Sequence, residues 1–193
     1  MPRVKLFKEE EVLQKAIQLF SMKGYHATSM QDLVDALGIN RASLYDTFGS
    51  KEALFDRAFA LYKRENRQRV LHFLAQQSSI KEGIFRLFDY AVDESVADKE
   101  AKGCLAVNTT TELIPGDQKI CSQLSENKAD FEKIFYDYLM SGIKKGEISP
   151  DKDAKALAAF LFTLYNGIKV VGKINPNKEE LMASVKAGLA VLD

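Results

Sequence analysis

The chain has 193 residues and 46% of them are hydrophobic, which is enough for one or two domains with a core of their own. Its 27 Lys and Arg residues balance 27 Asp and Glu residues, so a uniformly basic nucleic-acid-binding protein is excluded. The first 73 residues carry 12 basic and 9 acidic side chains, whereas the remainder carries 15 and 18. The N-terminal part is therefore mildly basic, which is the sign that contact with nucleic acid requires.

Composition also restricts the site chemistry and the compartment. Two cysteines, Cys104 and Cys121, make neither a disulfide framework nor a metal site, and we expect both to be buried and inert. A thiol sensor at Cys104 is the alternative. No apolar stretch reaches the roughly 18 residues of a membrane span, and the N-terminus lacks the apolar region of a signal peptide. We expect a cytoplasmic protein with no membrane partner, no metal and no cofactor.

Apolar residues recur at helical spacing nearly throughout, and no stretch alternates as a strand does. The first predicted helix carries an apolar stripe over residues 12–20 and closes at Gly24. Ser29 with Asp32 predicts a capping box, in which Asp takes the place of the usual Glu. The second helix that follows this box ends at Gly38.

Asn40 and Ser50 are predicted N-caps for a short helix at 41–48 and a long one at 51–74. Ser149-Pro150 is a further predicted N-cap, since Pro is favoured at the first helical position. A break is expected at Pro115-Gly116-Asp117. The remaining helices are expected at about 81–97, 104–112, 118–143 and 151–172, and from 177 onwards. The predicted fold is all-α, with about nine helices.

The stretch GINRASLYDTFGSKEALF, residues 38–55, has the form of a helix-turn-helix whose second helix is short. Packing of Leu44 and Phe48 inward leaves the other side of that helix exposed. Arg reads guanine through two hydrogen bonds, a small apolar residue contacts the thymine methyl, and Ser donates or accepts. The outward positions are Arg41, Ala42, Ser43, Tyr45, Asp46 and Thr47.

Residues of about 8–56 resemble, without a gap, the N-terminal domain of the TetR family of bacterial transcriptional regulators. The matching positions are Phe20, Gly24-Tyr25, Thr28-Ser29, Asp32-Leu33, Leu37-Gly38-Ile39, Ser43-Leu44-Tyr45, Phe48 and Ser50-Lys51-Glu52-Ala53-Leu54-Phe55. The later helices are similar to the variable regulatory domain of that family only in number and length.

The resemblance implies a DNA-binding domain at residues 1–50 and a ligand-binding and dimerisation domain at 51–193, linked by the helix at about 51–74. It implies a homodimer that binds a near-palindromic double-stranded DNA operator and releases it when a small molecule binds. The implied DNA contacts are Arg41, Ala42, Ser43, Tyr45, Thr47 and Lys51, with Thr28, Ser29 and Gln31 as weaker candidates for phosphate.

The last two helices are the implied dimer interface, and the all-round apolarity of 151–172 agrees with this. The expected interface residues are Leu157, Leu161, Leu164, Ile168, Leu181, Val185 and Leu189. Asp46 departs from the family pattern, because phosphates repel a carboxylate unless it accepts from a cytosine amine.

Aromatic residues at helical spacing in the second part are first of all core, and a subset is expected to enclose a largely apolar ligand. The pocket candidates are Phe88, Asn108, Thr111, Phe135, Tyr138 and Phe162, with Glu112 as a further polar contact. The run Lys63–Arg69 is interpreted as the solvated face of the long helix rather than as a phosphate-binding patch.

Three other interpretations stay open at this level. Residues 38–55 also fit an ordinary αα corner, because a short helix-turn-helix pattern is a weak signal by itself. An all-α dimeric adaptor that binds protein is the main alternative. An enzyme is disfavoured because the sequence lacks a metal cluster, a phosphate loop and a nucleophile with its base.

Overall fold

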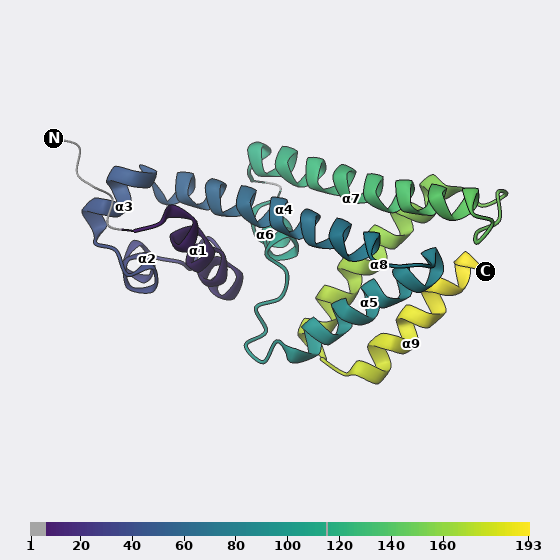
Figure 1. Ribbon diagram of the computed structural model, residues 1–193. Helices are drawn as coiled ribbons and strands as arrows, with labels where there is room; N and C mark the ends of the chain where they lie inside the picture. Colours follow the sequence, from purple (N-terminus) through teal and green to yellow (C-terminus); the bar gives the residue numbers. More distant parts are fainter. Residues whose placement is uncertain (1–6, 115) are drawn as a thin grey trace.

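The computed structural model describes residues 7–114 and 116–193, and within these ranges the chain is helical with no strand. Helices α1 to α3 lie at one end of an elongated molecule, and α4 runs from them into a bundle that contains α9 at the other end (Figure 1). The helices of the described residues are α1 (Glu9–Lys23), α2 (Met30–Leu37), α3 (Arg41–Phe48), α4 (Lys51–Ala75), α5 (Ile80–Ala97), α6 (Leu105–Leu113), α7 (Gln118–Lys144), α8 (Ala154–Ile174), α9 (Lys178–Leu189) and a terminal 3₁₀ turn (Ala190–Leu192).

Local side-chain signals set most helix starts, as predicted. Ser29 and Asp32 form a reciprocal capping box at α2, and the side chains of Asn40 and Ser50 cap α3 and α4. The N-cap predicted at Ser149-Pro150 is wrong, because these residues lie in a turn and Asp153 caps α8 through the amides of Lys155 and Ala156. Of the break predicted after α6, Pro115 lies outside the described residues and Asp117 caps α7.

Two apolar cores follow each other along the molecule, and α4 belongs to both. The first joins α1, α2 and α3 to the first half of α4, where Leu54 and Phe59 are fully buried. It also takes in α6 and the first turn of α7, through Leu105 and Ile120. Val70 at the other end of α4 belongs to the second core. The packing of the N-terminal end, formed by α1 to α3, therefore extends beyond residue 50.

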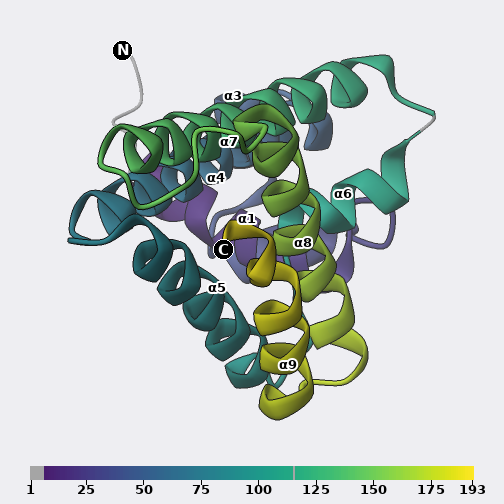
Figure 2. The same ribbon diagram turned by 90° about the vertical axis from the view of Figure 1, so that its right-hand side faces the viewer.

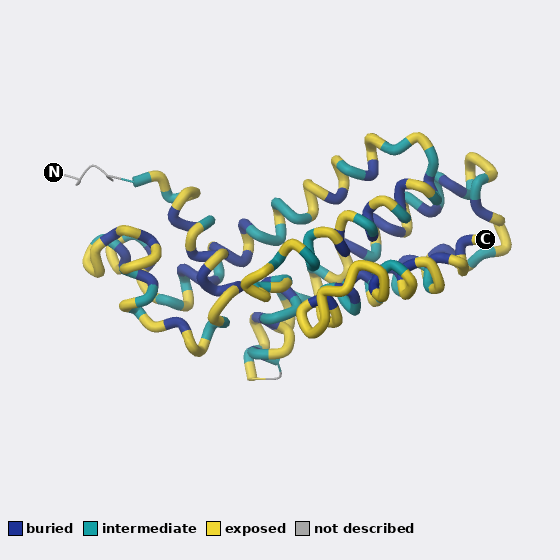
Figure 3. Tube along the Cα trace, turned by 90° about the horizontal axis from the view of Figure 1, so that it is seen from below, coloured by how far each residue is buried: buried dark blue, intermediate teal, exposed yellow. Residues whose placement is uncertain are grey.

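The second core is formed by α5, α7, α8 and α9 with the end of α4, and end-on the helices surround a common centre (Figure 2). Each helix buries one side and exposes another (Figure 3). Of the seven apolar residues expected at a dimer interface, two are only partly buried, and five are buried in this protomer's own core. The five are Leu161, Ile168, Leu181, Val185 and Leu189.

Helix α8 nevertheless keeps an apolar exposed face. By length and composition it is the one helix of the described residues apolar enough to cross a membrane, yet only 28% of its most apolar stretch is buried in this protomer. Val170, Val171 and Ile174 are 42%, 50% and 80% exposed. Apolarity on all sides therefore reflects one face in the core and another that no part of the described chain covers.

Candidate DNA-binding surface and regulatory cavity

A tight turn fixes α3 against α2. Gly38 ends α2 in the left-handed conformation, with φ 69° and ψ 27°, and its amide donates to the Val34 carbonyl oxygen at 3.1 Å. The Asn40 side chain then accepts the Ser43 amide at 2.8 Å and starts α3. Because both ends of this turn are hydrogen-bonded, the direction of α3 is set by the backbone of residues 38–43.

Packing then decides which side of α3 meets solvent. Leu44 is fully buried and Phe48 is 5% exposed, so the opposite side faces outward as predicted. Tyr45 is 42% exposed on this side of the helix. Arg41, Ala42 and Asp46 are exposed, while Ser43 and Thr47 are half-buried at the edges of this face.

Two basic residues of α4, Lys51 and Arg57, lie over aromatic rings beside the surface formed by α3. The Lys51 ammonium lies 4.4 Å from the centre of the Tyr25 ring, and burial lowers the pKa of Lys51, with Glu112 and Asp32 opposing that shift. The Arg57 guanidinium lies over the Phe48 ring and also donates to Glu9. Lys51 is thus half-buried beside α3 rather than fully extended into solvent.

The three weaker candidates near the start of α2 have different surroundings. Thr28 is 1% exposed and its hydroxyl donates to the Gly24 carbonyl oxygen at 2.5 Å, so its side chain is not part of the exposed surface. Ser29 is exposed, but its hydroxyl serves the capping box. Gln31 is exposed and donates to Asp35 at 2.8 Å.

Helix α6 connects the end of the molecule formed by α1 to α3 to the other helices through hydrogen bonds. The Glu112 carboxylate accepts the backbone amides of Tyr25 at 2.9 Å and His26 at 2.6 Å. One turn earlier, the Asn108 side-chain amide donates to the carbonyl oxygens of Ser21 at 3.0 Å and Lys102 at 2.7 Å. Both side chains were expected to line a pocket, and both instead hold the end of α1 and the turn after it.

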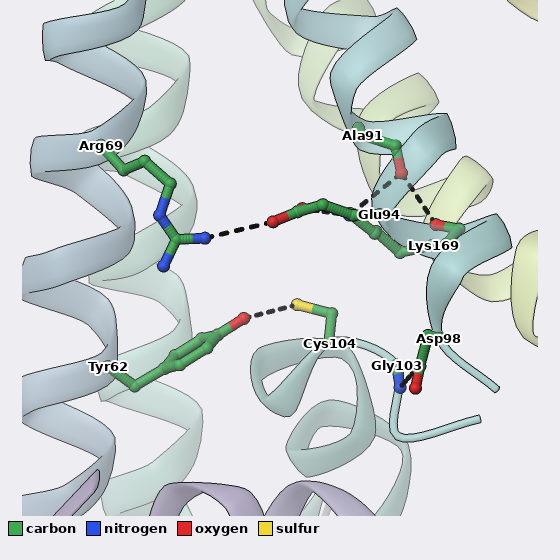
Figure 4. A network of polar contacts seen from close by, with 9 residues as sticks. Tyr62, Arg69, Ala91, Glu94, Asp98, Gly103, Cys104 and Lys169 are labelled. Carbon is green, nitrogen blue, oxygen red and sulfur yellow. Dashed lines mark hydrogen bonds and ion pairs between the residues drawn. The ribbon is translucent and has the colours of Figure 1, made fainter. Parts of the chain in front are cut away.

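A cavity of about 750 Å³ lies between α1, α4, α5, α8 and the segment that leads into α6. Its lining carries separate groups of polar contacts (Figure 4). Glu94 lies between two cations: Lys169 Nζ is 2.8 Å and an Arg69 terminal nitrogen 3.3 Å from its carboxylate oxygens. The Tyr62 hydroxyl and the Cys104 thiol share a hydrogen bond of 3.2 Å.

None of the six residues predicted to bind a ligand lines this cavity. Phe88 and Phe135 are fully buried in the second core, and Phe162 packs against it. The Tyr138 hydroxyl donates to the Ser79 carbonyl oxygen, and the exposed Thr111 bonds to the backbone of its own helix. Phe88 and Phe135 are therefore core, whereas Phe162 and Tyr138 are partly buried at its edge and Tyr138 lines a separate hollow between α4 and α7. Helical periodicity does not distinguish a filled interior from a cavity.

Sequence reasoning missed most of the cavity wall, although the run Lys63–Arg69 and Cys104 were singled out for other reasons. Arg69 ends the basic run that was assigned to a solvated face; its side chain is 54% exposed, in agreement with that assignment, and it also lines the cavity. The expectation of buried, inert cysteines is wrong for Cys121, which is exposed. Cys104 is half-buried at the cavity wall beside Tyr62.

A turn-linked pair of helices with an exposed polar face on the second, joined to a separate helical core, defines a helix-turn-helix DNA-binding regulator. Comparison with known proteins agrees. Residues 12–58 match the family model of bacterial regulatory proteins of the tetR family, and residues 82–187 match the tetracyclin repressor-like C-terminal domain. The chain belongs to the tetR family, and it is a DNA-binding transcriptional regulator rather than an enzyme.

Relatives and solved structures align along nearly the whole chain. The uncharacterised regulator YezE of Bacillus subtilis is 34% identical over the full length of both chains. The repressor ComR of Escherichia coli is 29% identical, over 93% of this chain and 86% of its own. A cysteine-substituted form of the regulator CifR, solved with double-stranded operator DNA, is 30% identical with a TM-score of 0.87, over 97% of this chain and 98% of that one.

Proposed function

We propose that the chain is a repressor that binds a near-palindromic operator as a homodimer and releases it when a small molecule binds. The observation that carries the DNA-binding part is the outward face of α3, where Arg41, Ala42 and the 42%-exposed Tyr45 stand beside a buried Leu44. In this proposal Arg41 reads guanine and Tyr45 donates to a phosphate.

The exposed face of α8 supports the homodimer. Burial of apolar surface is the main favourable contribution to association, and this face includes Val170, Val171 and Ile174 without cover from the described chain. A Cβ at Gly167, on the same helix, would meet no atom within 4 Å. A second α8 that crosses there would approach closely, because no side chain stands between the two backbones at Gly167. The partner surface is thus proposed to differ from the residues first expected, most of which pack inward.

The proposed response to a small molecule uses the contacts between the two ends of the protein. The cavity is lined by α1 of the DNA-binding end and by α5 and α8 of the other end. The N-cap residue of α6, Cys104, lines this cavity. Glu112, in the last turn of the same helix, bonds to the turn between α1 and α2. A ligand that prefers a different spacing of these helices shifts the dimer away from the DNA-bound arrangement, by no more than its differential affinity.

The deciding experiment is selection of bound duplexes from a random pool by the purified ligand-free protein at two salt concentrations. Enrichment of an inverted repeat that survives the higher salt, with half-sites about one helical turn apart, is the expected result. A purified dimer that enriches no sequence at either salt concentration would contradict the proposal and favour the protein-binding adaptor.

A further inference from the structure

We propose that the cavity between α1, α4, α5 and α8 is a binding site for a small organic carboxylate, held by the free side of the Arg69 guanidinium. The inference deepens the proposed function and rests on it, because it names the chemical class of the releasing molecule. It also replaces the largely apolar ligand that the sequence suggested.

The Arg69 guanidinium has unused hydrogen-bonding capacity. It carries five N–H donors, and among the described residues its one partner is Glu94, at 3.3 Å through one terminal nitrogen. In Figure 4 the second terminal nitrogen points away from Glu94, on the side of the guanidinium that faces Tyr62. A planar guanidinium with free adjacent donors matches a carboxylate through two parallel hydrogen bonds.

The cavity lining as a whole holds four basic and four acidic side chains, so the preference for an anion comes from the group of charges around Glu94. Lys169 and Arg69 share the single carboxylate of Glu94, which leaves one positive charge in excess. Hydrogen bonds or an ion pair engage the other acids of the wall, and the neutral donors at Glu65 and Asp98 leave the negative charges of these two carboxylates in place. Glu65 accepts from Gln14, Asp98 from the Gly103 amide, and Glu100 pairs with Lys102.

The start of α6 adds to the positive potential. The side chain of the N-cap residue, Cys104, makes no hydrogen bond to the first amides of this helix. The positive end of a helix favours a negative charge close to it. This effect is small by itself, and it acts here in the same direction as Arg69 and Lys169.

Apolar and neutral polar groups complete the site. Ile17 and Tyr165 line the cavity, and because they are 5% and 8% exposed, a small edge of each meets its interior. Burial raises the pKa of both Tyr62 and Tyr165, so both hydroxyls stay neutral and able to donate. The volume of about 750 Å³ lies within the roughly 300–1,000 Å³ of small-molecule sites.

The test uses three matched series of flat ligands with the full-length protein. The acids are benzoate and cinnamate, the neutral analogues are benzamide and cinnamamide, and the cations are benzylamine and cinnamylamine. Binding is measured by calorimetry without DNA, and operator affinity is measured separately by fluorescence anisotropy. At least one acid is expected to bind about tenfold or more tightly than its amide, and its amine to bind more weakly still.

Substitutions then assign the binding to Arg69. Arg69→Gln should weaken acid binding by about tenfold or more, and Arg69→Lys should give an intermediate loss because it keeps the charge without the two-pronged geometry. Arg67→Gln, two residues away on the same helix, is the matched control, since Arg67 does not line this cavity. Thermal unfolding of each variant checks that the loss is not one of folding.

Several results would overturn the assignment: an amide that binds as tightly as its acid, an amine that binds more tightly, or Arg69→Gln binding like the wild type. Failure of both acids to bind at about 1 mM would do the same. Failure of the proposed release mechanism can be distinguished from failure of the binding site. An acid that binds through Arg69 without changing operator affinity would support the site and contradict the release mechanism.

Discussion

Replacement of Gly24 by Ala probes the contact between α6 and the DNA-binding end. Gly24 has φ 81° and ψ 171°, a backbone region almost restricted to glycine. A Cβ there would lie 2.7 Å from a carboxylate oxygen of Glu112, which accepts the amides of Tyr25 and His26. The substitution therefore strains the backbone and displaces Glu112 from both amides.

The two effects have different sizes. Backbone strain costs about 1–3 kcal/mol, of which about 0.4–1 kcal/mol is offset because alanine restricts the unfolded chain. Loss of the Glu112 bonds adds about 1–2 kcal/mol, discounted because the carboxylate is half-exposed. We expect Gly24→Ala to lower the free energy of unfolding by roughly 1–4 kcal/mol, measured by urea denaturation at fixed protein concentration.

Gly146→Ala is the matched control. Gly146 also has a positive φ, 73°, but a Cβ there would meet no atom within 4 Å. It should show the backbone cost alone, and Gly24→Ala should cost less in a Glu112→Ala background than in the wild type. Equal costs at the two glycines, together with strict additivity in the double variant, would refute a stabilising contact between Glu112 and the turn.

Three further predictions concern the DNA-binding surface, the dimer and acid stability. Tyr45→Phe should weaken all duplexes similarly, by about threefold to tenfold, whereas Arg41→Ala should relax preference at one base position; duplex selection that leaves the Arg41→Ala preference unchanged would contradict base reading. Val171→Glu should shift the dimer toward monomer in sedimentation, because it places a charge on the exposed face of α8, and an unchanged dimer would exclude that face. Hydrogen bonds from Lys23 and Ser29 hold the pKa of Asp32 well below its usual range, so its contribution to stability is present above about pH 3.9 and is lost as the pH falls further. Asp32→Asn should therefore lower the urea midpoint at neutral pH, with a difference from the wild type that shrinks in acid; a constant difference would argue against this linkage.

The DNA-binding end could be predicted from sequence because its signals are local. Ser29, Asn40 and Ser50 each cap the helix that follows within three residues, and Gly38 marks a turn that needs a left-handed backbone. Burial of Leu44 and Phe48 followed from their spacing alone. Interactions within one or two turns of helix are visible in a single sequence.

The cavity and the free face of α8 were not predictable in the same way. Glu94, Cys104 and Lys169 come from three separate segments, and only tertiary packing brings them to one wall. Apolarity placed α8 at an interface but did not distinguish the side that meets α5 and α7 from the side left open. Leu161 and Val170 are equally apolar, and the fold buries the first and exposes the second.

The sharing of α4 by both cores has a consequence for engineered hybrids of such regulators. Its 25 residues span about 37 Å, and a cut at residue 50 would leave Leu54 and Phe59 without the rest of their core. A junction within the polar middle of α4, at about residues 63–69, would keep each apolar half with its own partners. Helix α6 lies on the C-terminal side of that junction, but its Leu105 and Leu113 belong to the N-terminal core. A hybrid therefore needs an α6 that comes from the same protein as its N-terminal fragment. Exchange of C-terminal domains among these proteins therefore requires a compatible junction within α4 and compatible core contacts along α6.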